Sequence, residues 1–361
     1  MPGLVIAHFG LKRQYGNLRD ELLDATDRAL KDGQLVGGHY TRSFEEWLKS
    51  RCQTKYAITV HSGSQALEII ARWKKEIHDG LETGFSARIR IPNLTYPATL
   101  NSFLNAGWAV ELCDTDRYGI ILDYPSTRTS SQGLYHCLVG LYGRMPWAHA
   151  LYNDAYGLIV DGAQHWLIAN GNVGSGMAIS FDPTKNLPSS GNGGAIVTNN
   201  ESLYKFATNY RDNGKLDKFS NIGTNSKMSE QDCAQLLVRT HYIDRWQERR
   251  SKIAKYWCDK FKDLPIRCMS DTTAPHAHQK FVLYLPDRSV LQRHLLAAGI
   301  DVKVHYDYVL GDLPIAADLV KPDMLSTSVM LSRGVISLPL YPELTDQEVI
   351  YITGKVRSCY K

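Results

Sequence analysis

Short apolar runs alternate with longer mixed segments along the first part of the chain. The runs are rich in β-branched and aromatic residues, and several end at Gly, Pro, Asn or Asp, which is typical of buried strands followed by turns. Amphipathic segments such as residues 64–77 lie between some of them and predict helices. This alternation favours a largely parallel α/β sheet covered by helices. The expected strands are residues 56–62, 87–95, 109–116, 134–143, 157–164, 178–182 and 194–199.

The pattern changes near residue 229. Residues 229–264 contain neither Gly nor Pro over many helical turns and predict one long helix. Separate strand candidates follow it. We therefore predict a large α/β domain over residues 1–235 and a smaller C-terminal α+β domain over residues 236–361, with a ligand cleft between them. The strand candidates of the smaller domain are residues 280–286, 299–306 and 335–340.

Composition excludes several classes of protein. The chain of 361 residues is 43% hydrophobic and 22% charged, with a net charge of +4 and no Lys/Arg-rich run, so we expect no nucleic-acid partner. No apolar run approaches the roughly 18 residues of a membrane span, and no basic leader precedes an apolar core, so we expect a cytoplasmic protein without a membrane partner. The seven cysteines are scattered without a CxxC pair, and His276 and His278 lack a third ligand, so we expect no metal.

A candidate phosphate site lies where the first expected strand ends. The predicted helix over residues 64–77 begins directly after Ser62 and Gly63, with Ser64 as its first residue. The first turn of a helix has unpaired N–H groups and a partial positive charge, and a glycine lets a ligand come close to the backbone. A phosphate cradle is one interpretation; Ser64 acting only as a helix cap is the other.

Three further residues follow other expected strands. Tyr96 could lie against a planar heteroaromatic cofactor, although core packing explains a lone tyrosine equally well. Asp161 ends an apolar run, with Gln164 three residues later. A carboxylate at such a position needs a cation or several donors, and a pyridinium N–H would serve. The alternative is that Asp161 caps the following turn.

Lys185 lies between an apolar run and a glycine-rich turn in "SFDPTKNLPSSGNGG", residues 180–194. Pro183 ends the strand, so the lysine is expected to project from a turn at the edge of the sheet. A partly desolvated lysine loses proton affinity and can act as a nucleophile and a base. A solvated surface lysine is the alternative when this motif is taken alone, but the series of strand-end residues, ending with Ser180 and Lys185, favours a cofactor site.

Taken together and in this order, the motifs resemble the DegT/StrS family of pyridoxal-phosphate (PLP) enzymes, the nucleotide-sugar aminotransferases of fold type I. The resemblance extends over nearly the whole chain. It implies a mostly parallel seven-stranded sheet sandwiched by helices, with a smaller C-terminal α+β domain. The matching segments are "GHYTRSFEEWL" (38–48), "SGSQAL" (62–67), "TYPAT" (95–99), "NAGWAVELCDTD" (105–116), "VGLYGR" (139–144), "VDGAQ" (160–164), "SFDPTKNLPSSGNGGAIVTN" (180–199), "GTNSKMSE" (223–230), "GIDVKVHY" (299–306) and "SLPLYPELTDQEV" (337–349).

The resemblance also implies roles for single residues. Lys185 would bind the aldehyde of PLP and move protons, and Asp161 would pair with the pyridine nitrogen. Gln164 would approach the phenolic oxygen of PLP and Tyr96 would stack on its ring. The remaining implied contacts are Gly63, Ser64 and Ser180 to the phosphate, Asn225 to the phosphate of the neighbouring subunit in a homodimer with shared sites, and Lys303, His305, Tyr306 and, less directly, Arg211 to the substrate.

The resemblance implies that the protein transfers an amino group to a keto sugar. It also implies that the sugar is linked to a nucleotide and that glutamate or glutamine is the amino donor. Alternatives within the fold are a keto-cyclitol aminotransferase and a non-catalytic PLP-fold sensor. A nucleotide-dependent oxidoreductase is a further alternative, but the chain lacks a GxGxxG after its first strand. Asp182, Asn192 and Lys227 depart from the common family pattern, so the substrate of a relative cannot be carried over directly.

Overall fold

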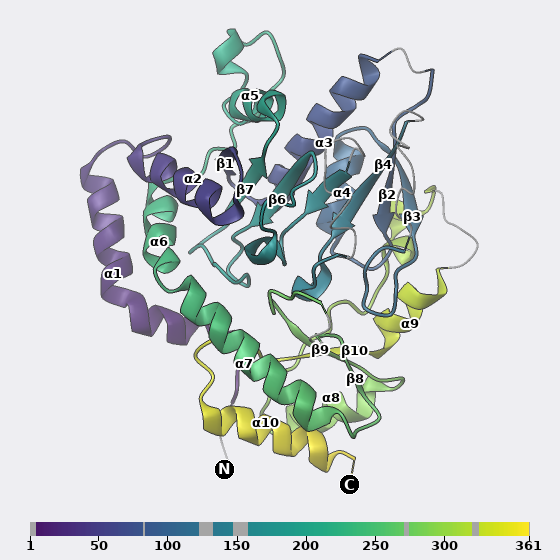
Figure 1. Cartoon of the computed structure of the whole chain (residues 1–361). Helices are drawn as coiled ribbons and strands as arrows, with labels where there is room; N and C mark the ends of the chain where they lie inside the picture. The colour runs from purple at the N-terminus through teal and green to yellow at the C-terminus, as the bar shows by residue number, and fades with distance from the viewer. Residues whose placement is uncertain are drawn as a thin grey trace.

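A seven-stranded sheet forms the centre of the larger part of the molecule. In the computed structural model, which describes residues 5–81, 84–122, 133–146, 158–270, 274–319 and 325–360, its strands run in the order β1-β7-β6-β5-β4-β2-β3 (Figure 1). Strands β2 to β6 pair in parallel, whereas β7 is antiparallel to both β1 and β6. The predicted mostly parallel α/β sheet is confirmed. Its strands are Tyr56–Val60 (β1), Arg88–Pro92 (β2), Ala109–Cys113 (β3), Leu134–Val139 (β4), Leu158–Asp161 (β5), Gly176–Ser180 (β6) and Gly194–Thr198 (β7).

Helices cover both faces of this sheet. Successive residues of a strand point to opposite faces, so Ala195 and Val197 of β7 join one apolar core while Ile196 joins the other. The first core includes α1, α2 and α6, and the second includes α3, α4 and α5. Burial on both faces explains why the strands are continuous apolar runs. The helices are Leu11–Lys31 (α1), His39–Cys52 (α2), Gly63–Asp79 (α3), Pro97–Asn105 (α4), Glu201–Tyr210 (α5) and Glu230–Thr240 (α6).

A smaller antiparallel sheet, β10-β9-β8, has a core of its own. Helix α7 connects the two parts, because Trp246 near its start packs in the larger core and Trp257 near its end packs in the smaller one. Ile6 also packs in the smaller core, close to β9 and β10. The boundary at residues 235 and 236 remains a prediction. The elements of this part are Ile243–Phe261 (α7), Arg267–Cys268 (β8), Phe281–Tyr284 (β9), Arg288–Ala297 (α8), Ser326–Gly334 (α9), Val335–Leu338 (β10) and Asp346–Ser358 (α10).

Two expected elements differ from the structure. The single helix predicted over residues 229–264 is two helices, α6 and α7, separated at His241 and Tyr242. Helix α6 packs on α1 and α2 whereas α7 extends toward the smaller sheet, so the change of direction comes from tertiary packing. Residues 299–306 form no strand; they make only single bridges, from Ile300 to Ile6 and from Lys303 to Ser337.

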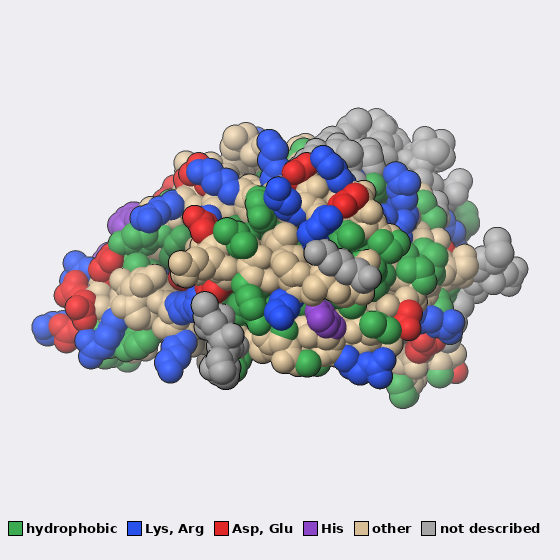
Figure 2. All heavy atoms as spheres, turned by 90° about the horizontal axis from the view of Figure 1, so that it is seen from below, with side chains coloured by type: hydrophobic (Ala, Val, Ile, Leu, Met, Phe, Trp, Pro, Cys, Tyr) green, Lys and Arg blue, Asp and Glu red, His purple; other side chains and the backbone are tan. Residues whose placement is uncertain are grey.

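The exterior has charges of both signs. Figure 2 shows basic and acidic side chains interspersed over the face seen from below. Ion pairs on the exterior include Arg357 with Asp263 and Arg249 with Asp346. Within the described ranges, no helix combines the length and the apolar character needed to cross a bilayer.

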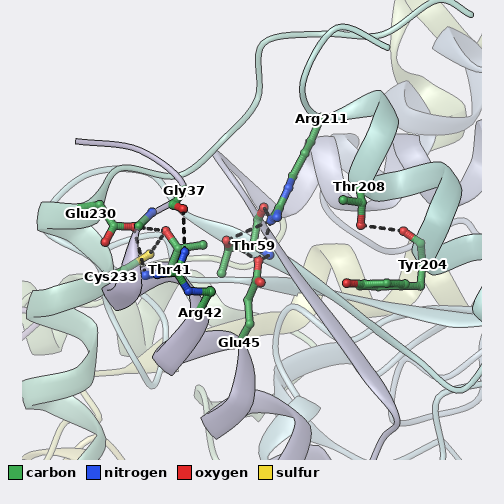
Figure 3. Close-up of polar contacts among 11 residues, drawn as sticks. Gly37, Thr41, Arg42, Glu45, Thr59, Tyr204, Thr208, Arg211, Glu230 and Cys233 are labelled. Atoms are coloured by element: carbon green, nitrogen blue, oxygen red, sulfur yellow. Dashed lines mark hydrogen bonds and ion pairs between the residues drawn. The ribbon is translucent and has the colours of Figure 1, made fainter. Parts of the chain in front are cut away.

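A buried carboxylate holds the start of α2. Glu230, 1% exposed, accepts hydrogen bonds from the backbone N–H groups of Gly38 (2.9 Å), Tyr40 (2.8 Å) and Thr41 (3.0 Å). It also accepts one from the Thr41 hydroxyl, and Figure 3 shows Thr41 beside Glu230. Gly38 has no side chain to cap the helix, so Glu230 supplies the acceptors that the first turn needs. The negative charge also lies at the positive end of the helix dipole.

Candidate active site

Four strand termini meet at one edge of the large sheet. Ser180 ends β6 and lies opposite Gly194, the first residue of β7, which in turn lies opposite Val60 at the end of β1. Asp161 ends the adjacent parallel strand β5. Ligands of open α/β sheets bind at the carboxyl ends of the strands, because the loops and helix N-termini collect there. This edge is therefore the candidate site.

The residues expected to form a phosphate cradle lie in closely packed backbone, and their binding to phosphate remains a prediction. A Cβ on Gly63 would lie 2.6 Å from the Cβ of Ser180, and a Cβ on Gly194 would lie 2.3 Å from the carbonyl carbon of Ser62. Neither glycine can therefore be replaced without a shift. The cap of α3 is Ser62, which accepts from the N–H of Gln65 at 3.1 Å, so the alternative of Ser64 as the cap is wrong.

Ser180 and Ser64 differ in their surroundings. Ser180 is 8% exposed, and its Oγ accepts from the N–H of Asp182 at 3.3 Å. Within the part of the chain that the structure describes, its hydroxyl proton has no acceptor. Ser64 lies on the exposed side of the first turn of α3. Both residues thus lie around the N-terminus of α3, where a phosphate would meet hydrogen-bond donors.

Asp161 has two hydrogen-bond donors. The Thr99 hydroxyl donates to Oδ2 at 2.8 Å, and the N–H of Ala163 donates to Oδ1 at 3.2 Å. The second bond is the local turn cap considered for this residue. Burial raises the pKa of Asp161, and the bonds from Thr99 and Ala163 and the charge of Lys185 oppose that rise only in part. The carboxylate therefore has room for a further cationic partner.

Lys185 lies in the loop between β6 and β7, as the sequence predicted. Its backbone N–H donates to the carbonyl of Asp182 at 2.8 Å, which fixes the turn. Its amine makes no hydrogen bond or ion pair with any residue that the structure describes. Burial lowers the pKa of Lys185, while the charges of Asp161 and Asp182 act in the opposite direction. A lysine in this state is more readily deprotonated and can act as a nucleophile and a base.

Gln164 and two tyrosines line the same site. The Oε1 of Gln164 accepts from the N–H of Tyr142 at 2.7 Å. Burial raises the pKa of Tyr306, and Tyr308 and Asp161 add to this rise, whereas a hydrogen bond with Gln164 opposes it. Tyr96 is 56% exposed, with its ring centroid 5.9 Å from that of Tyr306. One face of Tyr96 is thus available to a planar ligand.

The candidate substrate residues of the C-terminal part lie at different depths. The Nδ1 of His305 lies 2.8 Å from the hydroxyl of Ser337. Burial lowers the pKa of His305 to about 2, and the charges of Lys280, His8, Lys185 and Lys303 contribute. The neutral ring of His305 is therefore more stable there than the cation. Lys303 is more exposed and pairs with Asp301 at 2.9 Å.

Arg211 and Asn225 lie in other surroundings. The Nη1 of Arg211 donates to Glu45 at 2.5 Å and to the carbonyl of Thr59 at 2.8 Å (Figure 3). The guanidinium is thus engaged by the protein itself, and the structure gives it no contact with Lys185. Asn225 is exposed in the segment after α5, where it bridges to Asp212.

Several residues around the site were not identified from the sequence. Thr99 binds the carboxylate of Asp161, and the hydroxyl of Tyr142 donates to the carbonyl of His305 at 2.5 Å. Both residues lie within segments that carry the family resemblance, so their positions in those segments could have indicated that they belong to the site. Lys280 precedes an apolar strand, and His8 lies near the N-terminus. Only long-range packing brings these two toward Lys185.

Comparison with known proteins agrees with this geometry. The model of the DegT/DnrJ/EryC1/StrS aminotransferase family matches residues 17–128 and 148–357. The chain belongs to this family. It is 30% identical to the dTDP-3-amino-3,4,6-trideoxy-alpha-D-glucose transaminase of Streptomyces venezuelae, covering 96% of this chain and 94% of that protein. It is 28% identical to the erythromycin biosynthesis sensory transduction protein EryC1 of Saccharopolyspora erythraea, covering 96% and 98%. The structure of S. venezuelae DesV superimposes with a TM-score of 0.87, at 27% identity and 98% coverage of each chain.

The protein is an aminotransferase of the kind that converts keto sugars to amino sugars, and the cofactor of its family is PLP. The site fits this cofactor. Among the described residues it offers a Lys185 amine without a hydrogen bond or ion pair and, at Asp161, a carboxylate with room for a cation. It also offers the N-terminus of α3, around which Gly63 packs directly against Ser180 and Gly194 against Ser62.

Proposed function

We propose that the protein transfers an amino group from glutamate or glutamine to the keto group of a nucleotide-linked sugar. The observation that carries this proposal is that Lys185 and Asp161 are both buried at the same edge of the sheet, close enough for the charge of each to act on the pKa of the other. The relatives named above support the class of substrate, since one is a transaminase of a dTDP-sugar. Another relative, 26% identical, is named UDP-2-acetamido-2-deoxy-3-oxo-D-glucuronate aminotransferase.

In this proposal the site residues hold the cofactor as follows. Lys185 would bind the aldehyde, Asp161 would pair with the ring nitrogen, and Tyr96 would stack on the ring. Gln164, whose Oε1 accepts from Tyr142, would approach the phenolic oxygen. Gly63, Ser64 and Ser180 would hold the phosphate at the start of α3, because the N–H groups of the first helical turn and the Ser180 hydroxyl could donate to it.

PLP supplies a carbonyl that exchanges amino groups and a ring that accepts electrons when a proton leaves the carbon bearing the nitrogen. Asp161, held by Thr99 and Ala163, would stabilise positive charge on the ring nitrogen. Lys185 Nζ would take the proton from the α-carbon of the donor and later deliver a proton to the carbon that receives the amino group. The lowered pKa of Lys185 favours the free amine that the first of these steps needs.

In this proposal the keto-sugar acceptor binds next to Lys303, His305 and Tyr306. His305 contributes a neutral imidazole, held at Nδ1 by Ser337, so it can offer a hydrogen bond but no charge. Lys303 lies nearer the solvent and can meet the phosphates of the sugar nucleotide. Arg211 is not included, because Glu45 and Thr59 already engage its guanidinium.

We also propose a homodimer in which each subunit completes the site of the other. Asn225 supports this, because its side chain is exposed and makes no hydrogen bond to the residues the structure describes. The loop just before it presents three large apolar side chains to the outside. These are Leu216 (71% exposed), Phe219 (68%) and Ile222 (84%). Burial of such side chains against a second copy would be favourable.

The function is tested by a Lys185→Ala variant and a panel of keto-sugar nucleotides. Wild-type protein loaded with PLP should release an amino sugar from at least one of them with glutamate or glutamine. Lys185→Ala should lose at least about 10⁴-fold in kcat, because it lacks both the attachment point and the base. Lys205→Ala, which removes an exposed lysine paired with Glu201, is the matched control and should keep full activity. Borohydride reduction and peptide mapping should place the pyridoxyl label on Lys185; a label elsewhere would contradict the assignment.

Mixed dimers test the shared site. Subunits carrying Lys185→Ala and Asn225→Ala are each impaired as homodimers, but a heterodimer of the two has one site with both residues intact. Random reassociation should therefore restore about a quarter of the wild-type rate. Activity no higher than that of the Asn225→Ala parent would show that Asn225 does not serve the partner's site.

A further inference from the structure

A second buried amine lies beside Lys185. Lys280 directly precedes β9 and is 6% exposed, and its side-chain amine makes no hydrogen bond or ion pair with residues in the described ranges. Its Nζ lies 5.6 Å from the centroid of the Phe9 ring. A buried ammonium with only an aromatic face as partner is costly, because its hydration is lost without replacement. The position therefore needs an explanation.

The backbone holds Lys280 against the site. Its N–H donates to the carbonyl of Tyr142 at 3.1 Å, and Tyr142 in turn holds Gln164. The neighbouring Gln279 donates from Nε2 to the carbonyl of Thr184 at 2.9 Å, directly before Lys185. Gln279 is 4% exposed, and its Oε1 has no hydrogen-bond partner among the described residues. Phe9, Lys185 and Gln279 all line one cavity of about 20 Å³.

The charges around Lys280 are mostly positive. Burial, together with the charges of Lys185 and Arg250, lowers the pKa of Lys280 to about 7, while Asp182 acts in the opposite direction. Burial and the charge of Lys280 also lower the pKa of His8 to about 4 and of His305 to about 2. The region thus collects groups that can bind an anion, with one carboxylate, that of Asp182, acting on Lys280.

We propose that Lys280 binds the α-carboxylate of the amino donor. The inference rests on the proposed function. The carboxylate is bonded to the α-carbon, whose proton must come within about 3 Å of the Lys185 amine, so a cation next to Lys185 suits that group. The phosphates of a sugar nucleotide are less suited to this position, because at least one ring carbon and the glycosidic oxygen separate them from the keto carbon.

The chemistry of Lys280 also suits an enzyme with two unlike substrates. When the carboxylate binds, the amine takes a proton from the solvent and becomes its counter-ion. When the keto acid has left, the amine can release that proton, so that no positive charge remains buried while the uncharged sugar is bound. A residue with a pKa of about 7 can make both changes near neutral pH. An arginine could not, because it stays charged.

The two half-reactions of the PLP-loaded enzyme separate this role from a general one. Lys280→Met should raise the Kd of glutamate or glutamine in the first half-reaction by about 100-fold. The second half-reaction, from the aminated cofactor to the keto-sugar nucleotide, should change less than about threefold. Lys280→Arg should keep donor binding but slow the second half-reaction. Lys205→Met is again the surface control.

Equal losses in both half-reactions would overturn the proposal, since they would indicate a structural effect. A loss confined to the sugar half-reaction would overturn it too, in favour of a phosphate contact. If the wild type converts glutamate but aminates no keto sugar, the proposed acceptor is wrong, yet the donor half-reaction still tests Lys280.

Binding without turnover gives a second measurement. Calorimetry with 2-methylglutamate, which has no α-proton, in two buffers of different ionisation enthalpy reports the protons taken up on binding. Near pH 8 the wild type should take up a large fraction of one proton more than Lys280→Met does. Equal proton uptake by both proteins would exclude Lys280 as the carboxylate partner.

Discussion

Asp161 and Glu230 are two carboxylates inside the same chain with opposite surroundings. Glu230 accepts four hydrogen bonds from Gly38, Tyr40 and Thr41 at the start of α2. Asp161 accepts two, and burial raises its pKa. Four donors are about as many as one carboxylate can use. The first carboxylate is therefore complete within the fold, whereas the second has capacity for a ligand.

The basic side chains show the same contrast. Arg211 binds Glu45 and Thr59 through its guanidinium and is complete without a ligand. Lys185 and Lys280 make no polar contact of this kind within the described part of the chain, and burial lowers the pKa of both. Incomplete pairing of buried charge thus distinguishes the candidate site from the parts of the molecule that only maintain the fold.

Of the changes to the two carboxylates, Asp161→Asn is expected to have the larger effect on turnover. The amide keeps the shape of the side chain but loses the charge that stabilises a protonated ring nitrogen, so turnover should fall by at least about 10³-fold. Thermal unfolding should show little change, because a charge that burial disfavours has been removed. Thr99→Val is the control, since it removes one donor and leaves the carboxylate. Near-normal turnover of Asp161→Asn would remove the distinction between the two carboxylates.

Glu230→Gln tests the other side of the comparison. The amide NH₂ group would face backbone N–H groups that now donate to a carboxylate, so we expect a loss of about 3 kcal/mol in the free energy of unfolding. Urea denaturation measures this change. The folded fraction should keep its kcat, because Glu230, the first residue of α6, binds through its side chain to the start of α2. A stable variant with impaired kcat would reverse the assignment.

Stability should also depend on pH through the lysines of the site. The pKa of Lys280 is lowered to about 7 in the folded protein, whereas an unfolded lysine titrates near 10.4. Between these values the unfolded chain binds more protons, so the unfolding free energy of the cofactor-free protein should rise with pH, by about 2 kcal/mol from pH 7 to 9. Lys280→Met should flatten this rise. Identical slopes for the two proteins would show that Lys280 is not buried as an amine.

The smallest effect is expected from Arg211→Met. Loss of its bonds to Glu45 and Thr59 should reduce the unfolding free energy by about 1–2 kcal/mol. The KM for the sugar nucleotide should change less than about threefold, as measured by steady-state kinetics. A tenfold or larger rise in this KM would instead support the predicted contact between Arg211 and the substrate.

The sequence by itself determined the sheet and the chemistry along its edge. Apolar runs predict all seven strands of the large sheet, because strands buried on both faces need no polar alternation. The order of the motifs around Asp161 and Lys185 was sufficient to indicate the family, which the comparisons confirm. Both signals are local, since each depends on residues close together in the chain.

Tertiary structure decided how the charges are paired. Arg211 and Glu45 are 166 residues apart, and Thr41 and Glu230 are 189 apart, so no local pattern reveals either contact. The division of residues 229–264 into α6 and α7 depends on what each helix packs against. Lys280 is one lysine among many in the sequence. Only the fold buries it beside Lys185 without a counter-ion, because burial and electrostatic pairing are properties of three-dimensional neighbours.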